Sequence, residues 1–263
     1  MKANYKNWVP KGMLWGLGAG AVVCALFLAL LAVFHNFISG TITWILSIVL
    51  ACGLVILLVA LVWAVNAYNS FSYNGKRQLS RAIIEGTADY VHVPDGGKIL
   101  DVGCGSGALA IACAKRNPKA EVVGIDRWGK EYASFSQNLC ETNASAEGVA
   151  NISFRKGDAT KLNFPDESFD AVTSNYVYHN IMGVDKQALL LETLRVLKKG
   201  GTFAIHDIMS FRRYGDMEAF CAKLRSMGYE EVSCIDTANG KFMAAKEALL
   251  LELKGSTLLV GRK

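Results

Sequence analysis

A buried strand, a tight turn and the start of a helix are encoded in one short segment, Ile99-Leu100-Asp101-Val102-Gly103-Cys104-Gly105-Ser106-Gly107. An apolar run leads to a carboxylate, and glycine then recurs at every second position. Residues 107–115 follow with the small and apolar side chains of a helix. Tight turns, and ligands that approach bare backbone, both require glycine. The segment is therefore typical of a strand–turn–helix frame that holds a nucleotide-like ligand.

Short apolar runs alternate with amphipathic segments beyond residue 98. We expect strands at 98–102, 121–125, 152–155, 169–173, 202–206, 231–235 and 257–260. We expect helices at 75–91, 107–116, 129–143, 185–198, 216–227 and 239–252. This alternation predicts an α/β fold, a mostly parallel sheet with helices on both faces. Ligands of such sheets bind at the carboxyl ends of the strands, so residues directly after each strand are the candidate site residues.

Three carboxylates stand at the ends of consecutive predicted strands. Asp101 precedes the glycines, where a carboxylate suits a ligand that carries an ammonium group. Asp126 ends the second strand, where an acid can accept both hydroxyls of a ribose. Asp158 follows the third strand and is able to accept a hydrogen bond from an adenine amine, although alone it reads more often as a turn residue.

Polar side chains interrupt a row of aromatic residues after the fourth predicted strand. Asn175 and His179 indicate the wall of a site there, but His179 also suits a hydrogen-bonded position at a helix start. If the reaction needs a general base, His179 is the first candidate. Tyr176, His206 and Asp207 are the others, because they too lie at strand ends.

Residues 98–207 resemble the class I S-adenosylmethionine-dependent methyltransferases, in their small-molecule methyltransferase-domain branch. Five segments match in order and spacing. They are the glycine motif at 99–107, the ribose acid at 122–126, the adenine contact at 157–159, the fourth strand at 169–172 and the turn before the fifth strand at 194–201. The resemblance covers roughly 75–263 and is weakest after Asp207.

The resemblance implies a Rossmann-like seven-stranded sheet whose last strand, near 257–260, is antiparallel. It implies S-adenosyl-L-methionine as the cofactor, with Asp101 at its ammonium group, Asp126 at the ribose and Asp158 at the adenine. The full set that it assigns to the cofactor is Asp101, Gly103, Cys104, Gly105, Gly107, Asp126, Arg127, Asp158, Ala159 and Asn175.

The chain also departs from some branches of this family. Asn175-Tyr176-Val177-Tyr178 is not the N-P-P-Y or D-P-P-Y signature of enzymes that methylate DNA bases or protein glutamine. The cysteine set of arsenite-methylating enzymes is missing as well. We expect a small-molecule or lipid-like acceptor, and no nucleic-acid partner, because residues 76–263 carry 25 basic against 23 acidic side chains.

The seven cysteines are odd in number and form no C-x-x-C pair, so we expect buried reduced thiols and no metal site. The hydrophobic fraction, 52%, is concentrated near the N-terminus. No Asp, Glu, Lys or Arg lies between Lys11 and Lys76. Residues 13–35 and 41–66 are each long enough to cross a bilayer as a helix. A second apolar span follows where a signal peptide would give way to polar sequence.

Basic residues flank both spans, and the loop between the spans has none. The positive-inside rule then predicts an integral membrane protein with both termini and the catalytic domain in the cytoplasm. We expect a membrane anchor and linker over 1–74, with the linker at 66–74, and a methyltransferase domain over 75–263.

Two other functions share parts of this pattern. A nicotinamide-dependent reductase would use Asp126 and the glycine turn, but Ala108 stands where its fingerprint has a third glycine, and Asp101 has no role there. A membrane scaffold that binds the cofactor without turnover is the other alternative. Cofactor preference and a search for a methyl acceptor discriminate among the three.

Overall fold

The computed structural model describes residues 2–129 and 134–263, so residues 130–133 of the helix predicted at 129–143 lie outside the described residues. The chain divides into two compact units. The hairpin unit, Asn7–Gln78, contains α1 (Lys11–Phe34), the short 3-10 helix η1 (His35–Phe37) and α2 (Gly40–Phe71). The sheet unit is Leu79–Lys263 together with the N-terminal residues up to Lys6.

Both helices of the hairpin unit are long and apolar enough to cross a membrane. The second runs further than predicted, because residues 66–71 of the expected linker are helical. The polar groups there find partners without ending the helix. Asn66 donates from Nδ2 to the Val62 carbonyl, and Asn7 donates from Nδ2 to the Tyr68 carbonyl in the last turn. Phe71, the last residue of α2, is buried and its ring packs on Trp8, with centroids 4.9 Å apart.

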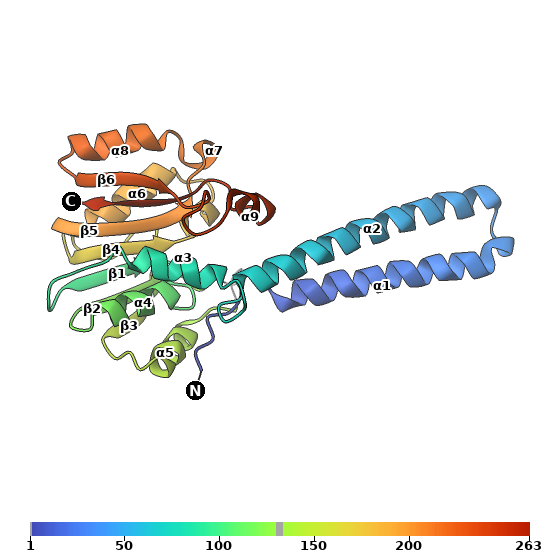
Figure 1. Ribbon diagram of the computed structural model, residues 1–263, viewed down its shortest axis with the longest axis horizontal. Coiled ribbons are helices and arrows are strands. Elements are labelled where there is room, and N and C mark those ends of the chain that lie inside the picture. The colour runs from blue at the N-terminus through green and yellow to red at the C-terminus, as the bar shows by residue number, and fades with distance from the viewer. Residues whose placement is uncertain (1, 130–133) are drawn as a thin grey trace. The chain divides into compact units, whose positions relative to one another are not determined.

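The sheet unit contains seven strands in the order β3-β2-β1-β4-β5-β7-β6 (Figure 1). The strands are β1 (Lys98–Val102), β2 (Glu121–Asp126), β3 (Ile152–Lys156), β4 (Phe169–Asn175), β5 (Leu197–Ile208), β6 (Glu230–Asp236) and β7 (Ser256–Arg262). β7 pairs antiparallel with both β5 and β6, and the pairs among the first five strands are parallel. The predicted Rossmann-like sheet and its antiparallel last strand are confirmed.

Helices cover both faces of the sheet (Figure 1). The helices of this unit are α3 (Leu79–Ala88), α4 (Ala108–Arg116), α5 (Gln137–Ala146), α6 (Lys186–Arg195), α7 (Phe211–Tyr214), α8 (Met217–Ser226) and α9 (Ala245–Leu250). Right-handed crossovers from β1 to β2 to β3 put α4 and α5 on one face, whereas the crossover from β4 to β5 runs the other way and puts α6 on the opposite face. The order therefore reverses between β1 and β4, where ligands of such sheets bind.

Local hydrogen bonds explain where the helices differ from their predicted bounds. The Ser136 hydroxyl accepts a hydrogen bond from the Leu139 amide, so α5 begins at Gln137. The helix expected over 239–252 is shorter, because Gly240 has a φ of +103° and the Phe242 amide donates to the Thr237 carbonyl. Residues 237–243 consequently form a turn that precedes α9.

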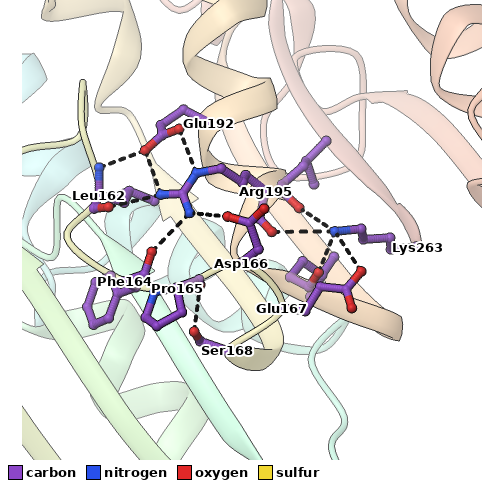
Figure 2. Close-up of polar contacts among 11 residues, drawn as sticks. Leu162, Phe164, Pro165, Asp166, Glu167, Ser168, Glu192, Arg195 and Lys263 are labelled. Atoms are coloured by element: carbon purple, nitrogen blue, oxygen red, sulfur yellow. Dashed lines mark hydrogen bonds and ion pairs between the residues drawn. The ribbon is translucent and has the colours of Figure 1, made fainter.

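The connection from β3 to β4 is held by one arginine of α6 (Figure 2). Arg195 donates to the carbonyls of Leu162 and Phe164 and to the carboxylates of Asp166 and Glu192. The hydrogen bonds from Arg195 hold the pKa of Glu192 below its usual value. This network fixes the loop that leads from the third strand end to the fourth.

Candidate active site

Asp101 lies near the end of β1, almost fully buried. Its register partner on β4 is Thr173, whose hydroxyl donates to Asp101 Oδ1 at 2.9 Å. The second oxygen, Oδ2, is buried and has no hydrogen-bond partner among the described residues. Burial raises the pKa of Asp101 to about 7 and outweighs the lowering effect of the Thr173 hydroxyl and the Ala110 amide. A buried carboxylate oxygen without a donor is costly, so this position suits a cationic ligand group.

All three glycines of the turn have positive φ, +75° at Gly103, +56° at Gly105 and +81° at Gly107. Their surroundings differ. A Cβ at Gly103 would clash with Val177, and one at Gly107 would press on the Phe154 ring. A Cβ at Gly105 would meet nothing within 4 Å. Gly105 is therefore the glycine whose backbone faces open space, as a ligand that approaches bare backbone requires.

Asp126 ends β2 and hydrogen-bonds to the glycine turn. Its Oδ2 accepts from the Gly105 amide at 2.9 Å and its Oδ1 from the Trp128 amide at 2.7 Å. Trp128 in turn donates from Nε1 to the Gly105 carbonyl at 3.0 Å. Both the amide and the carbonyl of Gly105 are thus hydrogen-bonded. The Cys104 thiol is buried toward Gly124, so Cys104 contributes only its backbone to the surface of the turn.

The predicted adenine-side residues lie at the next strand end. The Gly157 amide donates to the Asp126 carbonyl at 2.9 Å, so the turn with Asp158 and Ala159 adjoins the end of β2. Asp158 is exposed, and hydrogen bonds from the backbone and hydroxyl of Thr160 hold its pKa below the usual value. Arg127 is also exposed. Within the described residues, the hydrogen bonds of Asp158 go to Thr160 and not to Asp101 or Asp126, so the three carboxylates lie at one edge without sharing a bond.

Asn175 and His206 are neighbours on β4 and β5. His206 Nδ1 lies 2.9 Å from Asn175 Oδ1, and His206 Nε2 lies 2.7 Å from the Thr237 hydroxyl. Burial lowers the pKa of His206 to about 3. Both ring nitrogens are engaged and the imidazole is neutral, so His206 orients Asn175 and is a poor candidate for a general base.

His179 lies in the short 3-10 helix η3 (Tyr178–Asn180) that follows β4. Its Nδ1 is 2.5 Å from Oδ1 of Asp207, which is fully buried on β5, and its backbone amide donates to Asp207 Oδ2 at 3.1 Å. Burial alone would raise the pKa of Asp207, but the hydrogen bond and charge of His179 outweigh it and lower that pKa. The pairing fixes the ring and leaves Nε2 on a side chain that is 17% exposed.

Tyr176 is the remaining candidate base from the sequence. Its ring packs edge-on against both His179 and His206, with centroids 5.9 and 4.7 Å apart. Its hydroxyl bonds to the Ser256 hydroxyl at 2.6 Å, and burial raises the pKa of Tyr176. A phenol that stays protonated and is already hydrogen-bonded serves as a wall of the site better than as a base.

Asn143 of α5 contacts the glycine turn and was not found from the sequence. It is buried, and its Nδ2 donates to the Ser106 carbonyl at 2.9 Å and to the Asn4 carbonyl at 3.1 Å, while its Oδ1 accepts from the Asn4 amide at 2.7 Å. The N-terminal residues of the chain are thereby attached to the turn. No spacing in the sequence links positions this far apart.

The described residues fit S-adenosylmethionine. A buried carboxylate oxygen at Asp101 is available for its ammonium group, open space lies beside the Cα of Gly105, and Asp126 adds an acid at the neighbouring strand end. Among the described residues, no three His, Cys, Asp or Glu side chains lie close enough together to hold a metal ion.

Comparison with known proteins identifies the family. The methyltransferase domain family matches residues 94–251, so the chain belongs to this family. This confirms the predicted enzyme class and its cofactor, S-adenosylmethionine, and decides against the nicotinamide-dependent reductase.

Two relatives show how far the similarity extends. A demethylmenaquinone methyltransferase from Geobacillus kaustophilus is 32% identical over 172 residues, which cover 60% of this chain and 69% of the relative. An arsenite methyltransferase from Aquipseudomonas alcaligenes is 35% identical over 126 residues. That match covers 46% of this chain and only 36% of the relative.

Among solved structures, the [4+2]-cyclase SpnF superposes with a TM-score of 0.54 at 20% identity, covering 72% of this chain and 84% of the cyclase. This likeness concerns the fold. Because one fold supports different chemistries, the reaction has to be argued from the site.

Proposed function

We propose that this protein is a membrane-anchored methyltransferase that acts on a small, apolar or lipid-like acceptor at the cytoplasmic face of a membrane. The observation that carries the proposal is the unpaired, buried oxygen of Asp101 beside the open backbone of Gly105. An unpaired carboxylate oxygen can bind the ammonium group of S-adenosylmethionine, and the space beside a glycine lets its methionyl part approach the backbone.

Each residue at the carboxyl edge of the sheet has a proposed task. Asp101 binds the ammonium group, Asp126 the ribose hydroxyls, and Asp158 the adenine amine, with Arg127 and Ala159 beside the adenosine. Gly103, Cys104, Gly105 and Gly107 contribute backbone, and Asn175, oriented by His206, lines the methionyl side. When bound, the cofactor supplies an electrophilic methyl group, and the chain mainly aligns the acceptor with it.

His179 is the proposed general base. Asp207 accepts the hydrogen bond from Nδ1, which keeps the proton on that nitrogen and presents Nε2 as the acceptor for a proton from the nucleophile. His206 has both nitrogens engaged and Tyr176 has a raised pKa, so neither competes for this task.

Membrane anchoring by residues 1–74, with the methyltransferase domain over 75–263, is supported by the surface of the hairpin unit. Trp15, Phe27, Trp44 and Val59 are among many large apolar side chains exposed along α1 and α2. Core helices of soluble proteins bury such side chains, whereas membrane-spanning helices present them to lipid. The flanking lysines and arginines favour termini in the cytoplasm.

An apolar organic acceptor is favoured over arsenite. Of the two relatives, the demethylmenaquinone methyltransferase is matched over the larger part of its length, and its name refers to a quinone substrate. The three cysteines nearest the glycine turn, Cys104, Cys113 and Cys140, are all buried, so they offer no exposed thiols for arsenic.

Calorimetry on the full-length protein in detergent micelles tests the cofactor assignment. We expect binding of S-adenosylmethionine and S-adenosylhomocysteine, weakened by Asp126→Ala at least about tenfold, since each lost charge-assisted hydrogen bond contributes about 1.5–3 kcal/mol. Absence of binding would contradict the proposal, and an unchanged affinity in Asp126→Ala would remove the ribose assignment.

A second experiment tests turnover. The full-length protein is incubated with methyl-labelled cofactor and an extract of its host membranes, and the label is located after separation of lipids, proteins and nucleic acids. Label in the lipid fraction supports the proposal. Cofactor binding without any labelled product would favour a non-catalytic scaffold.

A further inference from the structure

The exposed apolar side chains of the sheet unit gather at one edge. Within its described residues, the large apolar side chains that are exposed are Met182 (87%), Phe211 (77%), Leu249 (68%), Leu250 (56%), Met227 (53%) and Val184 (39%). Only Met227 lies at the amino edge of the sheet, between α8 and β6. The other five lie in connections at the carboxyl edge, and we call them the apolar rim.

Three segments form the rim, and hydrogen bonds join them. Gln187, just after the segment with Met182 and Val184, donates from Nε2 to the Tyr214 carbonyl at 2.9 Å, which ties that segment to α7. The Met209 amide donates to the Gly255 carbonyl at 2.9 Å, which ties the start of α7 to the end of the α9 segment. These bonds hold the three segments next to one another along the carboxyl edge.

This surface adjoins the proposed general base. His179 precedes Met182 on the connection after β4, and Asp207 precedes Phe211 on the connection after β5. The proposed base and the rim therefore share two connections at the carboxyl edge.

We propose that the apolar rim docks on the surface of an anionic lipid bilayer, so that an apolar acceptor passes from the acyl layer to His179 without crossing water. The inference rests on the proposed membrane anchoring and methyl transfer, and it names the partner of the rim. Exposed apolar patches of this kind mark interaction sites, because soluble surfaces rarely cluster large apolar side chains.

Charge and chain length favour a bilayer as the partner. Arg212 and Arg213 are exposed on the same short helix as Phe211, where they can meet anionic headgroups. Asp185 and Asp216 are the N-caps of α6 and α8, so the partial positive charges at those helix N-termini offset part of their negative charge. Residues 72–78 alone separate α2 from α3, a reach of at most about 25 Å, so an inserted α2 keeps the sheet unit at the bilayer.

Tryptophan quenching in the full-length protein tests the docking. Phe211→Trp, Leu249→Trp and the control Met227→Trp are each reconstituted in vesicles of equal parts phosphatidylcholine and phosphatidylglycerol that contain dibrominated acyl chains. The measured quantity is the emission gained over the unchanged chain. We expect strong quenching at positions 211 and 249, because interfacial segments insert about 5–10 Å, and none at position 227.

Several outcomes would overturn the proposal. Equal quenching at positions 227 and 249 would show nonspecific adsorption. Shielding of positions 211 and 249 from aqueous iodide without quenching by the brominated chains would show that a second copy or another protein covers the rim.

The native residues Trp15 and Trp44, which are exposed on α1 and α2, separate this proposal from the anchoring. If these two are quenched while positions 211 and 249 are not, docking of the rim is wrong and the anchor stands. If none is quenched, both are wrong. Cofactor binding, measured on the same samples, reports on the methyltransferase assignment independently.

A charge variant sharpens the result. Arg212→Gln with Arg213→Gln should reduce quenching at position 249 more in vesicles with phosphatidylglycerol than in pure phosphatidylcholine. Lys199→Gln with Lys223→Gln, two exposed lysines near the start of β5 and in the last turn of α8, serves as a matched removal of two charges that should leave the quenching unchanged. An equal loss in both double variants would contradict headgroup contact at α7.

Discussion

The two halves of the sheet's carboxyl edge use their polar side chains differently. Along β1 and β2, hydrogen-bonding capacity and space remain unused. Asp101 has a buried oxygen without a donor, and the Cα of Gly105 faces open space. Along β4 and β5, the polar side chains bind each other, with His179 on Asp207 and Asn175 on His206. In the proposed function, the first half holds the ligand, and the second half holds its own side chains in fixed orientations.

Catalysis should therefore depend most on the second half, and cofactor affinity on the first. In the proposed mechanism, His179→Ala should lower kcat by about 10²–10⁴-fold, the usual contribution of a general base, and leave the cofactor Kd unchanged. Single-turnover methyl transfer beside calorimetry measures both. The exposed His92→Ala is the matched control. A large rise in the cofactor Kd for His179→Ala would contradict the separation of cofactor binding and catalysis between the two halves.

The open backbone of the first half is tested by one pair of glycines. Gly105→Ala and Gly96→Ala both place a Cβ at positive φ with nothing within 4 Å, so their backbone strain is comparable. Only Gly105→Ala would obstruct a ligand, and it should raise the cofactor Kd by roughly tenfold or more, equivalent to about 1.4 kcal/mol. If the two variants bind alike, the cofactor does not approach Gly105.

The unpaired oxygen of Asp101 predicts a pH dependence of binding. With a pKa of about 7, the carboxyl group is protonated at lower pH and must lose its proton to pair with an ammonium group. Cofactor affinity should thus fall by up to about tenfold for each pH unit below 7. Asp101→Asn should bind more weakly at pH 8 and lose this slope. If the cofactor affinity of Asp101→Asn still falls with pH below 7, a different group causes the pH dependence.

The raised pKa of Asp101 also determines how the stability of the folded protein changes with pH. The pKa of Asp101 is raised on folding, so the folded state holds this proton more tightly than the unfolded chain. Without cofactor, the contribution of Asp101 to stability is full below the unfolded pKa and declines as the pH rises toward 7. Asp101→Asn should flatten this part of the denaturation profile.

The smallest effect should come from the contact between the N-terminal residues and the glycine turn. Asn143→Ala removes the hydrogen bonds to Ser106 and Asn4 and should weaken cofactor binding by about three- to tenfold, since a hydrogen bond contributes about 0.5–1.5 kcal/mol. Asn151→Ala removes comparable bonds to three carbonyls that precede β2 and should leave Kd unchanged. Equal changes in both would indicate general destabilisation.

Sequence reasoning was most successful where chemistry follows directly from local order. The strand positions, the glycine turn and Asp101, Asp126, Asn175 and His179 at strand ends were all predicted, because strand, turn and helix are encoded within a few residues. The same reasoning ended the second apolar helix too early. Asn66 looks like a linker residue, but its side chain is satisfied within the helix by the Val62 carbonyl.

The sequence by itself determined the sheet, the order of the strand-end residues and the two apolar helices, since periodicity and turn chemistry are local properties. The tertiary structure alone decided which of these residues meet. Asp207 reaches His179 across 28 positions and Asn143 reaches Asn4 across 139, and only the packed sheet brings them together. It also showed that His206 is buried with both nitrogens engaged. In the described part of the sheet unit, five of the six large apolar side chains that are exposed lie in connections at the carboxyl edge. Burial and long-range pairing are products of packing, which no local pattern specifies.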